Sequence, residues 1–354
     1  METFGTLILS PEHLRILIFL VLSTFFCFIF LLCFPKFWTA LVLTIAGPPE
    51  RSFNSHKSPP SGAGLVFSCV YLLTGLILDV AGYSFLERPD LFFYLTPLFL
   101  MSVAGFLDDI FEFPWLPRLV FYFLTSVCFV VFTQPTGLLT EPELKKFDMV
   151  ILSLSIVVLL WMTNIYNFMD GIDGLAASEA IFVLLSVSLM CLFFSESTPS
   201  PFLFFLIGPL ISFLLLNLPK AKIFMGDSGS IFLGFFFGVA LLHEIDVSVW
   251  CWLTLLGMFL ADGTSTAMVR FFRRQNLAKK HQSHFYQHLS KRCGVWRALI
   301  LIQCCNVFWL FPMALLCFLN PQYGSQIFIV SMFPLLAIHF YFGAGRTEPH
   351  FFRE

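Results

Sequence analysis

The sequence predicts an all-α, polytopic membrane protein, and its composition is the first reason. Of its 354 residues, 58% are hydrophobic and only 12% are charged, whereas soluble domains carry about 25% charged residues. The apolar residues also fall in long stretches, and a membrane-spanning helix needs about 20 of them. Because a water-soluble fold could not bury this much apolar surface, residues 1–354 are expected to form one integral-membrane domain.

Eleven apolar segments are candidates for transmembrane helices. The first has neither a basic region before it nor a small-residue cleavage site after it, so it is expected to be a retained helix and not a signal peptide. The eighth is short and could be tilted or partly re-entrant. No internal repeat is found, and no connection is long enough for a soluble domain. The segments are 13–34, 64–86, 91–107, 118–133, 147–166, 175–194, 201–218, 229–243, 247–268, 298–319 and 325–342.

The distribution of basic residues predicts the orientation. With eleven crossings, 16 of the 20 Lys and Arg residues fall on the side that holds the loop 269–297 and the C-terminal tail. The positive-inside rule makes that side cytoplasmic. The N-terminus is therefore expected outside and the C-terminus in the cytoplasm.

Acidic side chains gather on the predicted cytoplasmic face. Charges near membrane helices are costly to keep unless they have a function. Carboxylates from separate loops on one face therefore predict a single composite site. They are Asp108 and Asp109 after the third segment, Asp170 and Asp173 after the fifth, Asp227 between the seventh and eighth, and Asp262 in the ninth.

The segment from Asn164 to Gly174 is the densest polar cluster. Its amide and carboxylate oxygens suit a hard cation such as Mg²⁺, and its glycines allow close approach of the backbone to a ligand. The alternative interpretation is a capped turn, in which Asp170 or Asp173 is the N-cap of the next helix. Both interpretations have equal weight at this point.

Two further acidic motifs carry the same ambiguity. The segment 222–230 places Asp227 between glycines ahead of a helix, where backbone N–H groups favour a phosphate, although Asp227 or Ser228 could be an ordinary N-cap. Asp108 and Asp109 lie at a helix C-terminus and oppose its dipole. They therefore need compensation from a bound cation or a Lys.

The basic loop 269–297 contains His281, His284 and His288. These three would share one face if the segment were helical. A zinc site is conceivable, but no clear fourth ligand is present. The alternatives are a solvated basic loop at the lipid headgroups or a site whose cations and imidazoles bind a diphosphate.

Three motifs in order along the chain resemble the polyprenyl-phosphate N-acetylhexosamine-1-phosphate transferases, the MraY/WecA family. The motifs are F-L-D-D at 106–109, N-x-x-N-F-M-D-G-I-D-G-L-A at 164–176 and K-I-F-M-G-D-S-G-S at 222–230. The resemblance implies a Mg²⁺-dependent enzyme of the bacterial inner membrane with its active site on the cytoplasmic face. Such an enzyme transfers N-acetylhexosamine-1-phosphate from a UDP-sugar to undecaprenyl phosphate and releases UMP.

The resemblance also implies roles for individual residues. Asn167 and Asp227 resemble the Mg²⁺ ligands. Asp108 resembles the catalytic residue that deprotonates or positions the lipid phosphate, with Asp109 beside it. Phe224 resembles the residue that stacks on the uracil base, in a pocket with Asp170 and Asp173. The full set of substrate-binding candidates is Lys57, Asn164, Asp170, Asp173, Phe224, His281 and His284.

Two departures from the family pattern refine the expectation. Ser61-Gly-Ala stands where the family usually has Arg-Gly-Gly, so a phosphate contact made by that Arg is missing or comes from elsewhere, with Lys57 as the candidate. The pattern from His281 to Gln287 looks more like the initiators of O-antigen and lipopolysaccharide synthesis. Transfer of phospho-N-acetylmuramoyl-pentapeptide is therefore the alternative within the family.

The expected reaction is direct attack of the lipid phosphate on the sugar-bearing phosphorus, with a two-step route through an aspartyl-phosphate as the alternative. A proton- or cation-coupled transporter would place its acids near the bilayer midplane, often with repeat symmetry. An alcohol phosphatidyltransferase would need an Arg after Asp170-Gly171 or Asp173-Gly174, which is absent. The expected partners are membrane lipid and the two substrates, with no nucleic acid; a homodimer is left open.

Overall fold

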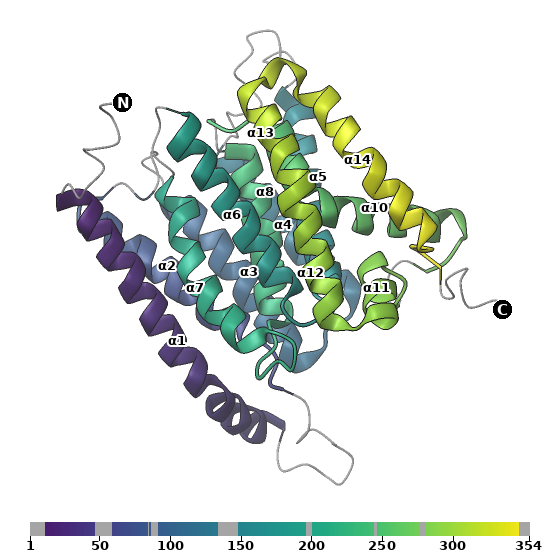
Figure 1. Ribbon diagram of the computed structural model, residues 1–354. Coiled ribbons are helices and arrows are strands. Elements are labelled where there is room, and N and C mark those ends of the chain that lie inside the picture. The colour runs from purple at the N-terminus through teal and green to yellow at the C-terminus, as the bar shows by residue number, and fades with distance from the viewer. Residues whose placement is uncertain are drawn as a thin grey trace.

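A computed structural model of the protein describes residues 11–46, 59–83, 85, 91–133, 148–195, 200–243, 246–276 and 281–346. Every regular element in these ranges is a helix, which confirms the all-α expectation (Figure 1). The helices are α1 (Pro11–Ala46), α2 (Gly64–Val80), α3 (Leu91–Phe111), α4 (Trp115–Thr133), α5 (Asp148–Met169), α6 (Leu175–Phe194), α7 (Pro201–Asn217), α8 (Gly226–His243), α9 (Val249–Leu255), α10 (Gly257–Phe272), α11 (Phe285–Cys293), α12 (Val295–Cys305), η2 (Asn306–Leu310), α13 (Phe311–Leu319), η3 (Pro321–Tyr323) and α14 (Gly324–Tyr341).

Each of the eleven predicted segments coincides with a helix or a pair of helices. Within the described residues, eight helical stretches are long and apolar enough to cross a membrane, and α2 and α7 are shorter apolar helices. The chain is therefore a multi-pass membrane protein. The count of eleven crossings and the orientation of the termini stay predictions.

Two predicted spans are interrupted. The ninth, expected at 247–268, is divided at Leu256 into α9 and α10. The tenth contains a π-helical turn, η2, between α12 and α13. Such π turns are rare and disturb the regular hydrogen-bond ladder, so a hydropathy pattern alone does not reveal them.

Helix α8 lies at the centre of the bundle and packs most extensively against α3 and α5. All its residues from Ser228 to Leu242 are buried, as expected for a helix that is apolar on every face and surrounded by others. Helix α1 lies along one edge of the bundle in Figure 1 and contacts α7 and α2. Many of its large apolar side chains are exposed, as suits a helix that faces lipid.

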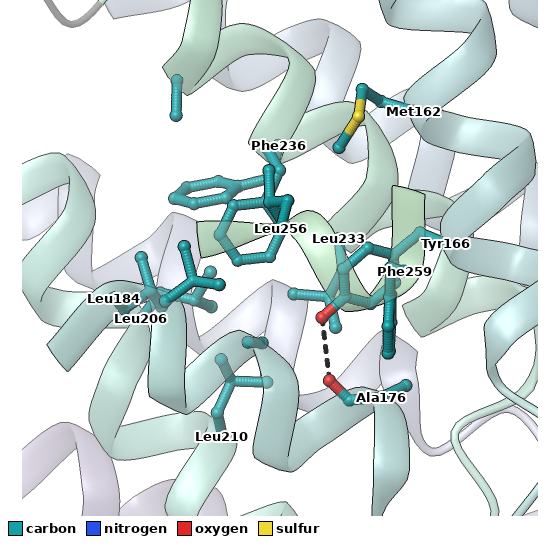
Figure 2. Close-up of a cluster of buried hydrophobic side chains, with 14 of the residues drawn as sticks. Met162, Tyr166, Ala176, Leu184, Leu206, Leu210, Leu233, Phe236, Leu256 and Phe259 are labelled. Atoms are coloured by element: carbon teal, nitrogen blue, oxygen red, sulfur yellow. Dashed lines mark hydrogen bonds between the residues drawn. The ribbon is translucent and has the colours of Figure 1, made fainter. Parts of the chain in front are cut away.

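Part of the core is built from aromatic and aliphatic side chains of α5, α6, α7, α8 and α10 (Figure 2). A hydrogen bond within this core joins α5 to α6: the Tyr166 hydroxyl donates to the Ala176 carbonyl over 2.8 Å. Tyr166 is fully buried and its ring stacks on Phe237. This bond fixes the end of α5 to the start of α6, so the loop 170–174 between them has a defined place.

Candidate active site

The site is built where the C-terminal end of α3 meets the N-terminal end of α8. The two backbones are so close that a Cβ at Gly105 would lie 2.3 Å from the Asp227 carbonyl oxygen. Gly226, which begins α8, has a φ of +70°, and a Cβ there would lie 2.4 Å from the Asp109 carboxylate. Because only glycine allows both approaches, these two positions let the acids of α3 reach α8.

Asp109 binds the N-terminus of α8. Its two carboxylate oxygens accept the backbone N–H groups of Asp227 over 3.0 Å and of Ser228 over 3.2 Å, and the Ser61 hydroxyl donates to it over 3.2 Å. The first N–H groups of a helix have no partner within the helix, and a negative charge there is favoured by the helix dipole. Asp109 therefore joins α3, α8 and the loop before α2.

Asp108 and Asp227 share one guanidinium group. Arg118 Nη1 on α4 donates to Asp108 Oδ2 over 2.5 Å and to Asp227 Oδ2 over 2.9 Å. The other oxygen of Asp108 accepts the backbone N–H of Phe113 over 2.8 Å. The compensation expected for two acids at the C-terminus of α3 is thus present: Arg118 serves Asp108, and the N-terminus of α8 serves Asp109.

Asn167, in the last turn of α5, completes the group. Its Nδ2 donates to Asp227 Oδ1 over 2.9 Å and to the Ser230 hydroxyl over 3.0 Å. We refer to Asp108, Asp109, Arg118, Asn167 and Asp227 as the acidic junction. It brings together side chains from α3, α4, α5 and α8, as the composite-site prediction required.

A second set of contacts ties the neighbouring loops together. The Asp173 carboxylate accepts the backbone N–H groups of Lys220 over 3.1 Å and of Ala221 over 3.2 Å. The Asn217 side chain accepts from Gly174 N and donates to the Ile223 carbonyl, both over 2.9 Å. The C-terminal end of the loop 170–174 is therefore held against the segment 217–223 by the side chains of Asp173 and Asn217.

Phe224 lies between these loops and the one that precedes α2. Its backbone N–H donates to the Pro60 carbonyl over 2.8 Å, and its own carbonyl accepts from Ala63 N over 3.1 Å. A shallow pocket of about 340 Å³ opens nearby and includes Asp173, Lys220 and Trp296 in its lining. The polar and aromatic groups expected to bind the nucleotide thus lie on neighbouring segments.

Asp170 does not cap α6, because the N-cap of that helix is Gly174 in a left-handed conformation with no side-chain cap. Burial, together with the negative charges of Asp227, Asp109 and Asp173, raises the pKa of the Asp170 carboxyl to about 8. Near pH 7 this carboxyl is therefore largely protonated in the ion-free protein. The capped-turn alternative fails for both Asp170 and Asp173.

The histidines form a separate cluster. Helix α11 begins only at Phe285, so the three histidines do not share a helical face. The rings of His281 and His284 stack with centroids 5.0 Å apart, while His288 Nε2 lies 3.1 Å from the Arg346 carbonyl oxygen. Burial and the neighbouring His284 and Arg270 lower the pKa of His281 to about 4, so His281 is neutral near pH 7.

The other predicted site residues have different outcomes. Asn164 donates its amide to the Leu160 carbonyl of its own helix over 2.7 Å. Lys57 lies outside the described residues. Sequence reasoning missed the roles of Arg118 and Asn217. Arg118 carried a signal, because it is a lone cation ten residues after Asp108 in an otherwise apolar helix.

In the described ranges, no three His, Cys, Asp or Glu side chains are arranged to hold a metal ion. That does not conflict with Mg²⁺, which is usually held by one or two carboxylates together with substrate phosphates. The acidic junction offers the carboxylates of Asp108 and Asp227. The Asn167 amide uses its Nδ2 for hydrogen bonds, so its Oδ1 remains as a further ligand. These oxygens fit the hard cation that the resemblance implies.

Comparisons with known proteins show which sequences this chain resembles. Residues 91–244, which include all five residues of the acidic junction and the four helices that carry them, match the model of glycosyl transferase family 4. The undecaprenyl-phosphate alpha-N-acetylglucosaminyl 1-phosphate transferase of Thermotoga maritima is 27% identical over 257 residues, which cover 72% of this chain and 76% of that protein. The phospho-N-acetylmuramoyl-pentapeptide-transferase of Petrotoga mobilis is 28% identical over 268 residues, which cover 69% of this chain and 82% of that protein. The enzyme of the same name from Leuconostoc citreum is 27% identical over 209 residues, which cover 54% and 63%.

Proposed function

We propose that this chain, a glycosyl-1-phosphate transferase whose residues 91–244 match glycosyl transferase family 4, transfers N-acetylhexosamine-1-phosphate from a UDP-sugar to undecaprenyl phosphate. The name of the Thermotoga maritima relative states phosphosugar transfer to that lipid, and transfer of a phosphosugar is the activity common to this name and to that of the pentapeptide transferases. The UDP-sugar donor, the release of UMP and the use of Mg²⁺ are the further content of the proposal.

The observation that carries this proposal is the meeting of three helices at Asp227, where Arg118 joins Asp227 to Asp108 and where Asn167 donates to Asp227. The reaction joins a phosphate to a diphosphate, and these two anions repel each other unless positive charge lies between them. Catalysis of phosphoryl transfer consists mainly of positioning and of electrostatic stabilisation. Oxygen ligands for a cation beside a guanidinium group provide for both.

Asn167 and Asp227 would hold the Mg²⁺ ion. When bound, such an ion neutralises the diphosphate and stabilises the charge that develops on the departing UMP. Arg118 supplies a second positive charge at the same place, and its fork of N–H donors suits phosphate oxygens. The proposal thus gives Arg118 the phosphate contact for which the sequence offered only Lys57.

In the proposed reaction, an oxygen of the lipid phosphate attacks the phosphorus that carries the sugar. A P–O bond forms between them, the P–O bond to the bridging oxygen of the diphosphate breaks, and UMP leaves. Asp108 orients the attacking phosphate or takes its proton. Asp109 acts indirectly. Its carboxylate accepts the N–H groups at the N-terminus of α8, and it thereby keeps Asp227 in place.

The uridine end of the donor is assigned to the loop 170–174 and the segment 217–224. Phe224 would stack on the base, Asp170 would lie beside it, and Asp173 lines the pocket described above. The basic segment with His281 and His284 would bind the diphosphate-sugar end. The proposed location is the bacterial inner membrane, with this face towards the cytoplasm, where the Lys and Arg residues concentrate.

The sequence after His281 favours an initiator of O-antigen or lipopolysaccharide synthesis over a pentapeptide transferase. Membranes that contain the protein, undecaprenyl phosphate and a panel of UDP-sugars, including the UDP-muramoyl-pentapeptide, test both. UMP release with a UDP-N-acetylhexosamine supports the proposal, whereas release only with the pentapeptide substrate supports the alternative. Solute uptake by reconstituted vesicles without any UMP release would instead support a transporter.

A further inference from the structure

Helix α11 is anchored on a buried acid. Asp262 of α10 is fully buried, and its carboxylate accepts the backbone N–H groups of Phe285 over 2.9 Å and of Tyr286 over 3.0 Å. His284 Nδ1 and the Thr266 hydroxyl also contact this carboxylate, over 3.2 Å and 3.1 Å. Since these N–H groups have no partner within α11, Asp262 fixes the start of that helix on α10.

Tyr286 extends from this anchored turn to the end of α5. Its hydroxyl donates to the Phe168 carbonyl over 3.0 Å, and its ring is only 1% exposed. The last carbonyls of a helix also have no intrahelical partner, so this bond satisfies a group that α5 itself leaves open. Phe168 directly follows Asn167, whose amide contacts Asp227.

Gly171 gives an independent sign that the contact is tight. A Cβ at this position would lie 2.0 Å from the Tyr286 hydroxyl oxygen and 2.9 Å from the ring carbon that bears it. Any larger residue at 171 would therefore displace Tyr286. The hydroxyl thus touches the polar segment at two points, one on each side of Asp170.

We propose that Tyr286 is a positioning residue that latches the start of α11 onto the segment 167–171 and so sets the place of Asn167 beside Asp227. We call this contact of Tyr286 the latch. Because Asp262 fixes the start of α11, the latch connects the histidine segment to the acidic junction. The histidines and the cation, which would bind different parts of the donor, would then stay at a fixed distance from each other. This inference rests on the proposed function.

The first test compares Tyr286→Phe with Tyr71→Phe. Tyr71 is a matched control, because its buried hydroxyl also donates to a carbonyl of another helix, that of Phe202, over 2.9 Å, but away from the site. Mn²⁺ is titrated into each purified protein without substrate and followed by electron paramagnetic resonance. Loss of a neutral hydrogen bond predicts about fivefold weaker Mn²⁺ binding in Tyr286→Phe, with Tyr71→Phe equal to wild type.

The second test uses Gly171. Gly171→Ala is expected to weaken Mn²⁺ binding in the wild-type background, because the new methyl group displaces Tyr286. In the Tyr286→Phe background the closest clash is gone, so the same substitution should cost clearly less. Independent effects of the two substitutions would overturn the latch.

Turnover separates this inference from the function on which it rests. If the wild-type protein releases no UMP from any UDP-sugar, the proposed function fails. If the wild type releases UMP and Tyr286→Phe matches it in Mn²⁺ affinity and in the Mg²⁺ concentration for half-maximal turnover, the positioning role fails and the function stands. A loss of affinity shared by Tyr71→Phe would also overturn the role, since it would mark a general effect on stability.

Discussion

Arg118 Nη1 lies 2.5 Å from Asp108 Oδ2 and 2.9 Å from Asp227 Oδ2, so one guanidinium group joins the acids of α3 and α8. Asp108 is largely buried, with 9% of its side chain exposed, whereas 28% of the Asp227 side chain is exposed. The less accessible acid thus depends more on Arg118 for its counter-charge. In the proposed reaction the same group contacts the incoming phosphates.

Replacement of Arg118 should therefore impair both charge balance and catalysis. Arg118→Met is expected to lower the rate of UMP release by about a hundredfold or more, the usual effect of losing one donor that stabilises a transition state. Arg118→Lys should retain more activity but stay well below wild type, because a point charge cannot reproduce the planar fork. Wild-type turnover by Arg118→Met would remove this residue from the mechanism.

Asp227→Asn is expected to abolish nearly all activity and to leave the fold intact. The substitution keeps the shape of the side chain and removes the charge that a divalent cation needs. The matched control is Asp246→Asn, which neutralises an exposed acid between α8 and α9 and should have no effect. Turnover in detergent, with thermal unfolding as the check on folding, decides the point, and an active Asp227→Asn enzyme would exclude Asp227 from the metal site.

Asp109→Ala should destabilise the protein because it strips the N-terminus of α8 of its acceptor. The loss of a helix cap typically costs about 1–2 kcal/mol, and Asp109 accepts from two N–H groups. Asp109→Asn keeps one accepting oxygen and should lose less. The measurement is the thermal unfolding midpoint in detergent. The opposite order of the two variants would argue against the capping role.

Asp170 predicts a particular pH dependence of stability. Its pKa is raised from 3.8 to about 8 in the folded protein, so the folded state binds this proton more tightly than the unfolded state does. Its contribution to the free energy of unfolding is complete below pH 4 and is lost as the pH rises towards 8. Without divalent cations, the thermal unfolding midpoint of the wild type should decrease as the pH is raised from 5 to 8.

Asp170→Asn removes this titration and should make the same fall shallower. Asp246→Asn, which neutralises an exposed acid between α8 and α9, serves as the control for the loss of a charge. Identical slopes for the wild type and Asp170→Asn would show that the Asp170 carboxyl does not bind its proton in the way described. Thermal unfolding in detergent with a chelator, at several pH values, provides the measurement.

The positions of the helices could be predicted from hydropathy because each membrane-spanning segment is a local feature of the sequence. The breaks could not, since the division at Leu256 and the π turn at Asn306 leave the apolar pattern unchanged. The acids of the site could also be selected from sequence, because carboxylates are rare and costly in such a chain. Their helix ends could be assigned as well.

The different contacts that the two neighbouring acids make could not be predicted. Asp108 and Asp109 are adjacent in sequence, but successive side chains on a helix point in different directions. One therefore reaches Arg118 on α4 and the other reaches the N-terminus of α8. That outcome depends on the close approach of Gly105 to α8. The role of Tyr286 likewise depends on where α11 begins, and the spacing of the histidines does not reveal that start.

The most direct test of the central claim is a balance of products with the purified protein. UDP-N-acetylhexosamine labelled in the sugar is incubated with undecaprenyl phosphate, with Mg²⁺ or with a chelator, and UMP and labelled lipid are counted. The account predicts equal amounts of both with Mg²⁺, neither with the chelator, and full recovery when Mg²⁺ is restored. UMP and labelled lipid formed at the same rate in the chelator would contradict it.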